Sequence, residues 1–371
     1  MPSADSRPYP FDALVQAWLD CRRNKRNSAS ALAFEQHAER HLVQLDHELT
    51  SGRYTPGRSI CFVVTRPKPR EVWAADFRDR VVHHPLYNHI APRFHAGFVA
   101  GSSACIPGRG TLYAARRLEH HVRSVTGNWQ HPAWYLKCDL ANFFVSIDKH
   151  VLFGLLCRRL HEPWWRQLAA TILFHDPRPG AELRGDPARL ALVPPHKSLY
   201  NAPADTGLPI GNLSSQFFAN VLLDALDQRA KHQLQARHYV RYVDDFVLLH
   251  REPAVLHAAL QDLTAWLPRQ LHCRINPAKT ILQPVARGID FVGHVVKPWR
   301  RTTRRGTVAR AVRRLEHAPA ADVHQLANSY LGLVRQASHP HAEQARIARA
   351  ALRRGHCVDG GLTKTFKPRS L

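Results

Sequence analysis

The feature that most restricts the fold of this chain is a pair of adjacent aspartates inside an apolar run. The run reads Tyr239-Val240-Arg241-Tyr242-Val243-Asp244-Asp245-Phe246-Val247-Leu248-Leu249. Its alternation predicts two strands joined by a tight turn, with both carboxylates at the tip of the hairpin. Neighbouring carboxylates in apolar surroundings repel each other and destabilise the fold unless cations neutralise them. Taken alone, the pair is equally compatible with an ordinary Asp-Asp turn.

A third aspartate ends another apolar strand. The stretch Trp134-Tyr135-Leu136-Lys137-Cys138 leads directly into Asp139. Three carboxylates from two strands supply the oxygen ligands that a pair of Mg²⁺ ions requires, and Mn²⁺ suits the same ligands. One ion would activate an attacking 3′-hydroxyl, while the other would hold a triphosphate and the leaving pyrophosphate. We therefore expect Asp139, Asp244 and Asp245 to bind two catalytic metal ions.

The charge of the chain indicates a polyanionic partner. Lys and Arg number 52 against 29 Asp and Glu, a net charge of +23 with histidine neutral, and such a surplus is typical of proteins that bind nucleic acid. There is no run of about 18 apolar residues and no signal-peptide pattern, so we expect neither a membrane nor a secretory route. The seven cysteines are scattered without a CxxC pair, which is typical of reduced thiols in a cytoplasmic protein.

Periodicity and composition predict the order of the elements. Residues 174–207 lack periodicity and are rich in proline, which indicates a long surface excursion, and a basic, acid-free run follows Val296. Helices are expected at 11–50, 76–95, 112–125, 150–175, 208–234 and 253–271, and strands at 60–65, 134–138, 238–250, 281–285 and 289–296.

These features together resemble the palm of reverse transcriptases. Besides Tyr-x-Asp-Asp and the upstream Asp139, three segments resemble family motifs in the family's order: 207–216, 275–280 and 291–294. The resemblance implies an α+β right-hand polymerase with fingers, palm and thumb, acting as an RNA-directed DNA polymerase (a nucleotidyltransferase). The implied domains are an N-terminal helical extension (1–55), fingers and palm with a Pro-rich insert near 174–206 (56–296), and a basic helical thumb with a C-terminal tail (297–371).

The resemblance also implies roles for individual residues. Phe144 matches the steric gate, an aromatic ring that excludes a ribose 2′-hydroxyl, although a core phenylalanine is the alternative. Lys279 matches a lysine proposed to protonate pyrophosphate, with a plain surface lysine as the alternative. The triphosphate and the nascent pair would be contacted by Lys68, Arg70, Ile210, Gly211 and Gln216. Nucleic acid would be contacted by Arg78, Arg80, Arg109, Gly110, Arg300, Arg301, Arg304 and Arg305, of which Arg78 and Arg80 could instead support the fold.

The partners implied are an RNA template or structured non-coding RNA, a DNA primer, the cDNA and dNTPs. An accessory protein or a homo-oligomer is compatible with the sequence.

One departure from the general family pattern is informative. Many reverse transcriptases carry Gln-Gly where this chain has Ile210-Gly211, and Ser-Pro where it has Ser215-Gln216. The form found here resembles the diversity-generating retroelement branch, as do segments 66–70, 80–84 and 329–332. In that branch the loss of the glutamine accompanies error-prone copying opposite adenine.

Three alternatives remain at the level of sequence. Bacterial reverse transcriptases of anti-phage defence, which make cDNA from an associated non-coding RNA, carry a similar signature. A non-catalytic RNA-binding scaffold with the same fold is a second alternative. An RNA-dependent RNA polymerase is a third, which Phe144 disfavours.

Overall fold

The computed structural model describes residues 8–23, 28–66 and 68–367 of the chain. Pro67 of the motif at 66–70 and parts of the expected N-terminal extension lie outside these residues. The chain divides into two compact units. The first comprises Met1–Val99, Asp139–Arg229 and Gln261–Pro277, and the second comprises Ala100–Cys138, Ala230–Leu260 and Ala278–Leu371. No helix within the described ranges is both long and apolar enough to span a bilayer.

Helices make up most of the first unit, as the apolar periodicity predicts. In the first of them Leu14, Ala17 and Cys21 are buried at spacings of three and four, which places them on one face of the helix. The stretch expected as one helix at 150–175 is two, because Pro163 begins a new helix at its first turn. The helices are α1 (Phe11–Arg22), α2 (Ala29–Glu35), α3 (Ala38–Thr50), α4 (Phe77–His95), α6 (Phe143–Ser146), α7 (Lys149–Cys157), α8 (Pro163–Phe174) and α9 (Leu213–Gln228).

A three-stranded sheet in the order β2-β1-β4 completes the first unit. Strands β1 (Ile60–Val64) and β2 (Arg70–Ala74) form an antiparallel hairpin. The Pro-rich segment, expected to be an excursion without regular structure, contributes the short strand β4 (Glu182–Leu183), which pairs in parallel with β1. The same segment covers the hairpin further along, where Tyr200 lies 4.7 Å from the buried ring of Trp73. The insert is therefore part of the fold of this sheet.

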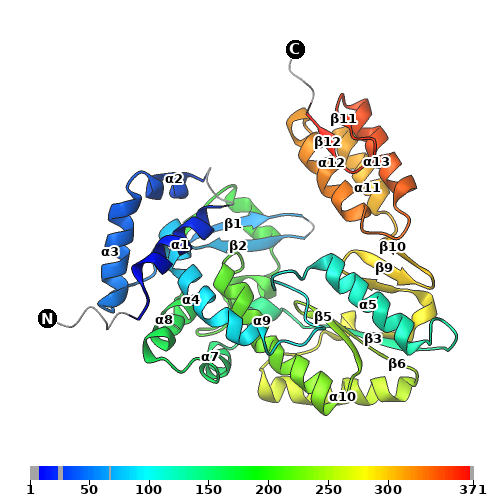
Figure 1. The fold of residues 1–371 in the computed structure, drawn as a ribbon, viewed down its shortest axis with the longest axis horizontal. Coiled ribbons are helices and arrows are strands. Elements are labelled where there is room, and N and C mark those ends of the chain that lie inside the picture. Colours follow the sequence, from blue (N-terminus) through cyan, green and yellow to red (C-terminus); the bar gives the residue numbers. More distant parts are fainter. Residues whose placement is uncertain (1–7, 24–27, 67, 368–371) are drawn as a thin grey trace. The chain divides into compact units, whose positions relative to one another are not determined.

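The second unit contains a four-stranded sheet in the order β5-β6-β3-β7. Helix α5 (Thr111–Val125) packs on it, with Leu118 and Val122 buried against Tyr135, Val240 and Val247 (Figure 1). The strands are β3 (Trp134–Asp139), β5 (His238–Tyr242), β6 (Asp245–His250) and β7 (Ile281–Pro284), and α10 (Pro253–Gln270) follows β6.

A second, three-stranded sheet follows along the chain. It consists of β8 (Ile289–Phe291), β9 (His294–Lys297) and β10 (Arg300–Thr303). The basic run after Val296 was expected to be helical, yet its first part is strand β10, which pairs with β9 from Arg300↔Lys297 to Thr303↔His294. The helix begins only at Thr307, after Gly306 has turned the chain with a φ of 82°.

Three helices gather at the C-terminal end of the second unit. They are α11 (Thr307–His317), α12 (Ala320–Val334) and α13 (His341–Arg353), and the strands β11 (Cys357–Val358) and β12 (Thr365–Phe366) pair beside them (Figure 1). Within each helix the buried residues are spaced mainly three and four apart, and the three helices share one core, to which they contribute Leu315, Leu331 and Ile347. Helices thus form in this part of the chain, as expected, and they share a core of their own.

Candidate active site

The two adjacent aspartates lie at the tip of a hairpin, as the alternation predicts. Tyr242 pairs with Asp245, so Val243 and Asp244 form a two-residue loop between β5 and β6. Val243 has a φ of 54°, a left-handed conformation that a β-branched residue rarely adopts. Backbone outliers of this kind cost about 1–3 kcal/mol and persist only where the surroundings fix them.

The buried side chain of Arg241 fixes this turn. The side chain is fully buried, and its Nη1 donates a hydrogen bond to the carbonyl oxygen of Val243 at 3.0 Å. Its Nη2 donates to Oγ of Ser102 at 2.7 Å. A guanidinium inside an apolar sheet is tolerated only when acceptors surround it, and here those acceptors are the turn itself and a neighbouring loop.

That neighbouring loop approaches β5 very closely. The backbone of Gly101 accepts a hydrogen bond from Arg241 N, and Ser103 N donates to the Arg241 carbonyl oxygen. A Cβ at Gly101 would lie 2.5 Å from the carbonyl oxygen of Tyr239, so only glycine fits. The Gly/Ser segment before α5 thus acts as a short extra strand that supports the hairpin.

A lysine side chain lies beside the second aspartate of the turn. Lys137 of β3 places its Nζ 3.2 Å from Oδ2 of Asp245 and donates a hydrogen bond to the carbonyl oxygen of Asp290 at 2.7 Å. The next residue, Cys138, is buried, and burial raises the pKa of its thiol to about 12, so it stays neutral. The Asp245 carboxylate is therefore already partnered by one positive charge.

Asp139 is the last residue of β3, the strand next to β6 in the sheet. Its carbonyl oxygen accepts a hydrogen bond from the backbone of Asn276 at 2.8 Å. Across the described residues, no group of three or more His, Cys, Asp or Glu side chains is arranged to hold a metal ion. Carboxylate oxygens are the ligands that hard divalent ions prefer, so each of the three aspartates expected to bind metal carries a suitable type of donor.

Phe144 lies on the short helix α6, directly after Asn142, whose φ is 50°. The ring is half-buried and makes an edge contact with Phe143 at 5.4 Å between centroids. Its carbonyl oxygen accepts a hydrogen bond from Leu208 N at 2.7 Å, which ties α6 to the segment that leads into α9.

Ile210 and Gly211 lie against strand β2 in the first unit. The carbonyl oxygen of Ile210 accepts a hydrogen bond from Trp73 N at 2.7 Å. Gly211 has a φ of 132°, and a Cβ there would lie 2.9 Å from Cγ1 of Val72 and 3.0 Å from the carbonyl oxygen of Trp73. Asn212 accepts a hydrogen bond from Ala75 N, and the exposed Gln216 lies in the first turn of α9. The backbone of this segment is therefore fixed to strand β2 of the three-stranded sheet in the first unit.

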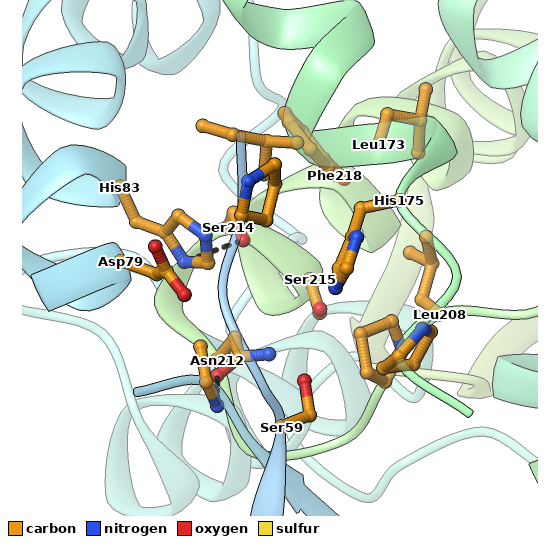
Figure 2. A pocket seen from close by; sticks show the side chains of 15 residues that line it. Ser59, Asp79, His83, Leu173, His175, Leu208, Asn212, Ser214, Ser215 and Phe218 are labelled. Atoms are coloured by element: carbon orange, nitrogen blue, oxygen red, sulfur yellow. Dashed lines mark hydrogen bonds between the residues drawn. The ribbon is translucent and has the colours of Figure 1, made fainter. Parts of the chain in front are cut away.

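A small cavity lies beside the same segment (Figure 2). Its volume is about 20 Å³, enough for roughly one water molecule and far too small for a nucleotide. His83 points its Nδ1 at Oγ of Ser214, 3.2 Å away, and the carboxyl group of Asp79 lies next to it (Figure 2). Burial lowers the pKa of His83 to about 3, so the ring is neutral. The cavity therefore lies among residues that pack beside the segment leading into α9, and it is not itself a nucleotide-binding site.

The basic residues expected in the fingers differ in their surroundings. Lys68 and Arg70 are exposed at the β1–β2 turn and at the start of β2. Arg78 forms ion pairs with Glu48 and Asp79 and lies over the ring of Tyr54. Arg80 donates from Nε to the carbonyl oxygen of Ala75 at 2.8 Å. The observed contacts of Arg78 and Arg80 are thus internal to the first unit.

The other basic residues expected to contact nucleic acid lie in the second unit, and they also differ in their surroundings. Arg300, Arg305 and Lys279 are exposed, and Arg304 is exposed but paired with Asp290. Arg301 is buried and bound to Glu119 and to the carbonyl oxygen of Gln336. Arg109 donates to the Ser102 carbonyl oxygen at 2.8 Å and lies over Tyr113, and Gly110 precedes α5.

Sequence reasoning missed the residues that hold the turn in place. Neither Arg241 nor Lys137 was a candidate, although both are charged residues inside strands that otherwise read as buried. A charge in such a position needs a partner, and this signal could have found them. The partners, Ser102 and the turn carbonyl, were not predictable because they depend on tertiary pairing.

A four-stranded sheet with a covering helix and a Tyr-x-Asp-Asp turn is the arrangement that the resemblance predicts for the palm of a polymerase. A sequence profile described as "Reverse transcriptase (RNA-dependent DNA polymerase)" matches residues 74–296, more than half of the chain. The chain therefore belongs to the reverse transcriptase family, an enzyme family of RNA-directed DNA polymerases. Its fold is the α+β fold of that family. No curated protein sequence matches the chain significantly.

Among solved structures, the chain is similar to yeast telomerases. Apo telomerase from Candida tropicalis truncated from its C-terminal domain has a TM-score of 0.49 at 10% identity, over 66% of this chain and 55% of that one. Apo telomerase from the same species has a TM-score of 0.49 at 9% identity, over 81% of this chain and 64% of that one. Candida albicans telomerase in complex with a fragment of telomeric RNA has a TM-score of 0.45 at 10% identity, over 81% and 60%. The chain thus spans 55–64% of the length of these structures.

Proposed function

We propose that this protein is an RNA-directed DNA polymerase that extends a DNA primer on an RNA template with dNTPs. The observation that carries the proposal is the Asp244-Asp245 turn, fixed by the buried Arg241 in a strained conformation within the region that matches the family. A merely structural turn has no need of a left-handed valine or a buried guanidinium, since glycine and an apolar side chain would form it at lower cost.

Divalent ions belong to the chemistry of this family. Asp139, Asp244 and Asp245 would hold them, and when bound the ions would lower the pKa of the primer 3′-hydroxyl and neutralise the triphosphate. Lys137, at 3.2 Å from Asp245, keeps that carboxylate compensated and oriented toward β3.

The nucleotide would be contacted by residues from four other segments. The half-buried ring of Phe144 would exclude a ribose 2′-hydroxyl. The exposed Lys68 and Arg70 would grip the triphosphate, and Lys279 would protonate pyrophosphate. Gln216, exposed at the first turn of α9, would contact the nascent pair.

Primer extension tests this proposal most directly. With an annealed RNA template, the intact protein is expected to incorporate dNTPs and not NTPs in the presence of Mg²⁺ or Mn²⁺. Asp244→Asn removes one ligand charge, and a loss of about 4 kcal/mol of transition-state stabilisation corresponds to about a 10³-fold lower rate. Asp12→Asn, an exposed change on α1, is the matched control. Absence of dNTP incorporation by the intact protein rejects the polymerase proposal and leaves the non-catalytic RNA-binding scaffold. Full activity of Asp244→Asn rejects the proposed role of Asp244 as a metal ligand.

We further propose that copying is error-prone opposite adenine, as in diversity-generating retroelements. Ile210 supports this because its backbone is fixed by Trp73 while its side chain offers no hydrogen bond to a nascent pair. Ile210→Gln is expected to lower misincorporation opposite adenine, measured by sequencing the cDNA, while Ile210→Leu leaves it unchanged. Equal error rates for wild type and Ile210→Gln would reject this role of Ile210. A low error rate opposite adenine in the wild type itself would reject the error-prone assignment and favour the defence-type alternative.

A further inference from the structure

Helix α5 carries a basic groove at its N-terminal half, on the second unit. The groove has a volume of about 550 Å³ and is open to solvent. The backbone around Gly108 and Gly110 is uncovered, since a Cβ at either would meet nothing within 4 Å. The groove is lined by Gly108, Gly110, Thr111, Leu112, Tyr113, Arg116, Arg117 and His120.

The two arginines of this groove, Arg116 and Arg117, form no ion pair among the described residues. Arg116 is exposed and Arg117 is half-buried, and neither has a carboxylate partner within the described part of the chain. The Nε of Arg117 is buried without any acceptor. Within α5, Glu119 is the single acidic residue, and it is committed to Arg301 and Arg123.

More positive charge gathers next to the groove from another part of the second unit. Burial lowers the pKa of Lys231, and the nearby charges of Arg117 and Arg237 lower it further. Lys231 donates hydrogen bonds to the carbonyl oxygens of Ala236 and Arg237, which leaves its charge uncompensated. Cations that mutually disfavour their charged forms are stabilised when a polyanion binds them.

We propose that this surface, formed by the α5 groove together with Lys231 and Arg237, binds the phosphate backbone of an RNA. Arginine forks match phosphate oxygens bidentately, and the open backbone ahead of α5 offers N–H groups at a positive helix end. Tyr113 also lines the groove, with the guanidinium of Arg109 over its ring, and adds an aromatic group to the surface. The proposal rests on the proposed function for the choice of RNA over another polyanion, and it extends the expected contacts at Arg109 and Gly110 to a second set of residues.

The experiment measures binding of a short blunt RNA duplex by the full chain as a function of salt. In Arg116→Gln plus Arg237→Gln, both exposed residues, affinity is expected to fall about tenfold, and the slope of log K against log salt by about 2. The matched control removes two exposed arginines outside the groove, Arg158→Gln plus Arg269→Gln. Arg116→Glu alone is a second variant, expected to fold normally and to bind more weakly than the control.

Two results would overturn the proposal. One is equal affinity and equal salt slope for the groove variant and the control. The other is a loss confined to a DNA duplex of the same length, with RNA binding intact. Because binding needs no catalysis, failure of the polymerase proposal in primer extension and failure of this groove are separate outcomes.

Discussion

Replacing Arg241 by methionine is the sharpest test of how the aspartate turn is held. Methionine keeps most of the buried volume but removes the hydrogen bonds to Val243 and to Ser102, at 3.0 and 2.7 Å. Each charge-assisted bond contributes about 1.5–3 kcal/mol, and relief from burying an ion offsets part of the loss. We expect the free energy of unfolding to fall by about 2–4 kcal/mol.

The turn should also lose its geometry. Without the guanidinium, Val243 loses the hydrogen bond to its carbonyl oxygen that accompanies its φ of 54°, and relaxation of the backbone would rotate Asp244 away from its present direction. We therefore expect primer extension to slow by more than about tenfold even at a temperature where the variant is fully folded.

Chemical denaturation and primer extension on the same preparations measure both effects. Arg269→Met, which removes an exposed arginine from α10, is the control for loss of charge. If Arg241→Met matches this control within about 0.5 kcal/mol and keeps its rate, the reasoning about the clamp is refuted.

Two further changes probe the support of the site. Gly211→Ala should lower the free energy of unfolding by about 1–3 kcal/mol, because the φ of Gly211 is 132° and a Cβ would meet Val72 and Trp73. Gly180→Ala is the control, with a positive φ but open space around it, and should lower the same free energy by about 1 kcal/mol. Equal losses for the two variants in chemical denaturation would contradict this reasoning. Burial lowers the pKa of His83 from 6.5 in the unfolded chain to about 3 in the folded protein. The unfolded chain therefore binds a proton that the folded protein does not, so the contribution of His83 to stability is complete above pH 6.5 and is lost as the pH falls toward 3. His83→Gln should flatten part of the decline in melting temperature between pH 7 and 4, and an unchanged decline would speak against a neutral buried ring.

The aspartate hairpin was predictable because its information is local. Alternation from Tyr239 to Leu249 defines both strands, and the polar pair between them defines the turn. Helix α5 and strand β3 follow from periodicity in the same way. Family motifs then indicated the class of enzyme, since their order along the chain is specific.

What could not be predicted depends on pairing between distant segments. Strand β4 forms in a Pro-rich stretch only because the backbone of β1 offers it hydrogen bonds. Strand β10 forms in a basic run because β9 pairs with it. The partner of Arg241 lies 139 positions away in sequence, and no local pattern connects the two.

The division of the chain into interleaved segments has a consequence for its biogenesis. Because the first unit needs Gln261–Pro277 and the second needs Ala278–Leu371, neither can close until most of the polypeptide has left the ribosome. The N-terminal helices are synthesised before the later segments that complete their unit, so part of their apolar surface stays exposed during synthesis. We therefore expect folding to be slow, because it depends on long-range contacts, and to depend on chaperones. No single cut of the chain separates the two units, so expressing one alone would require joining segments that are distant in sequence.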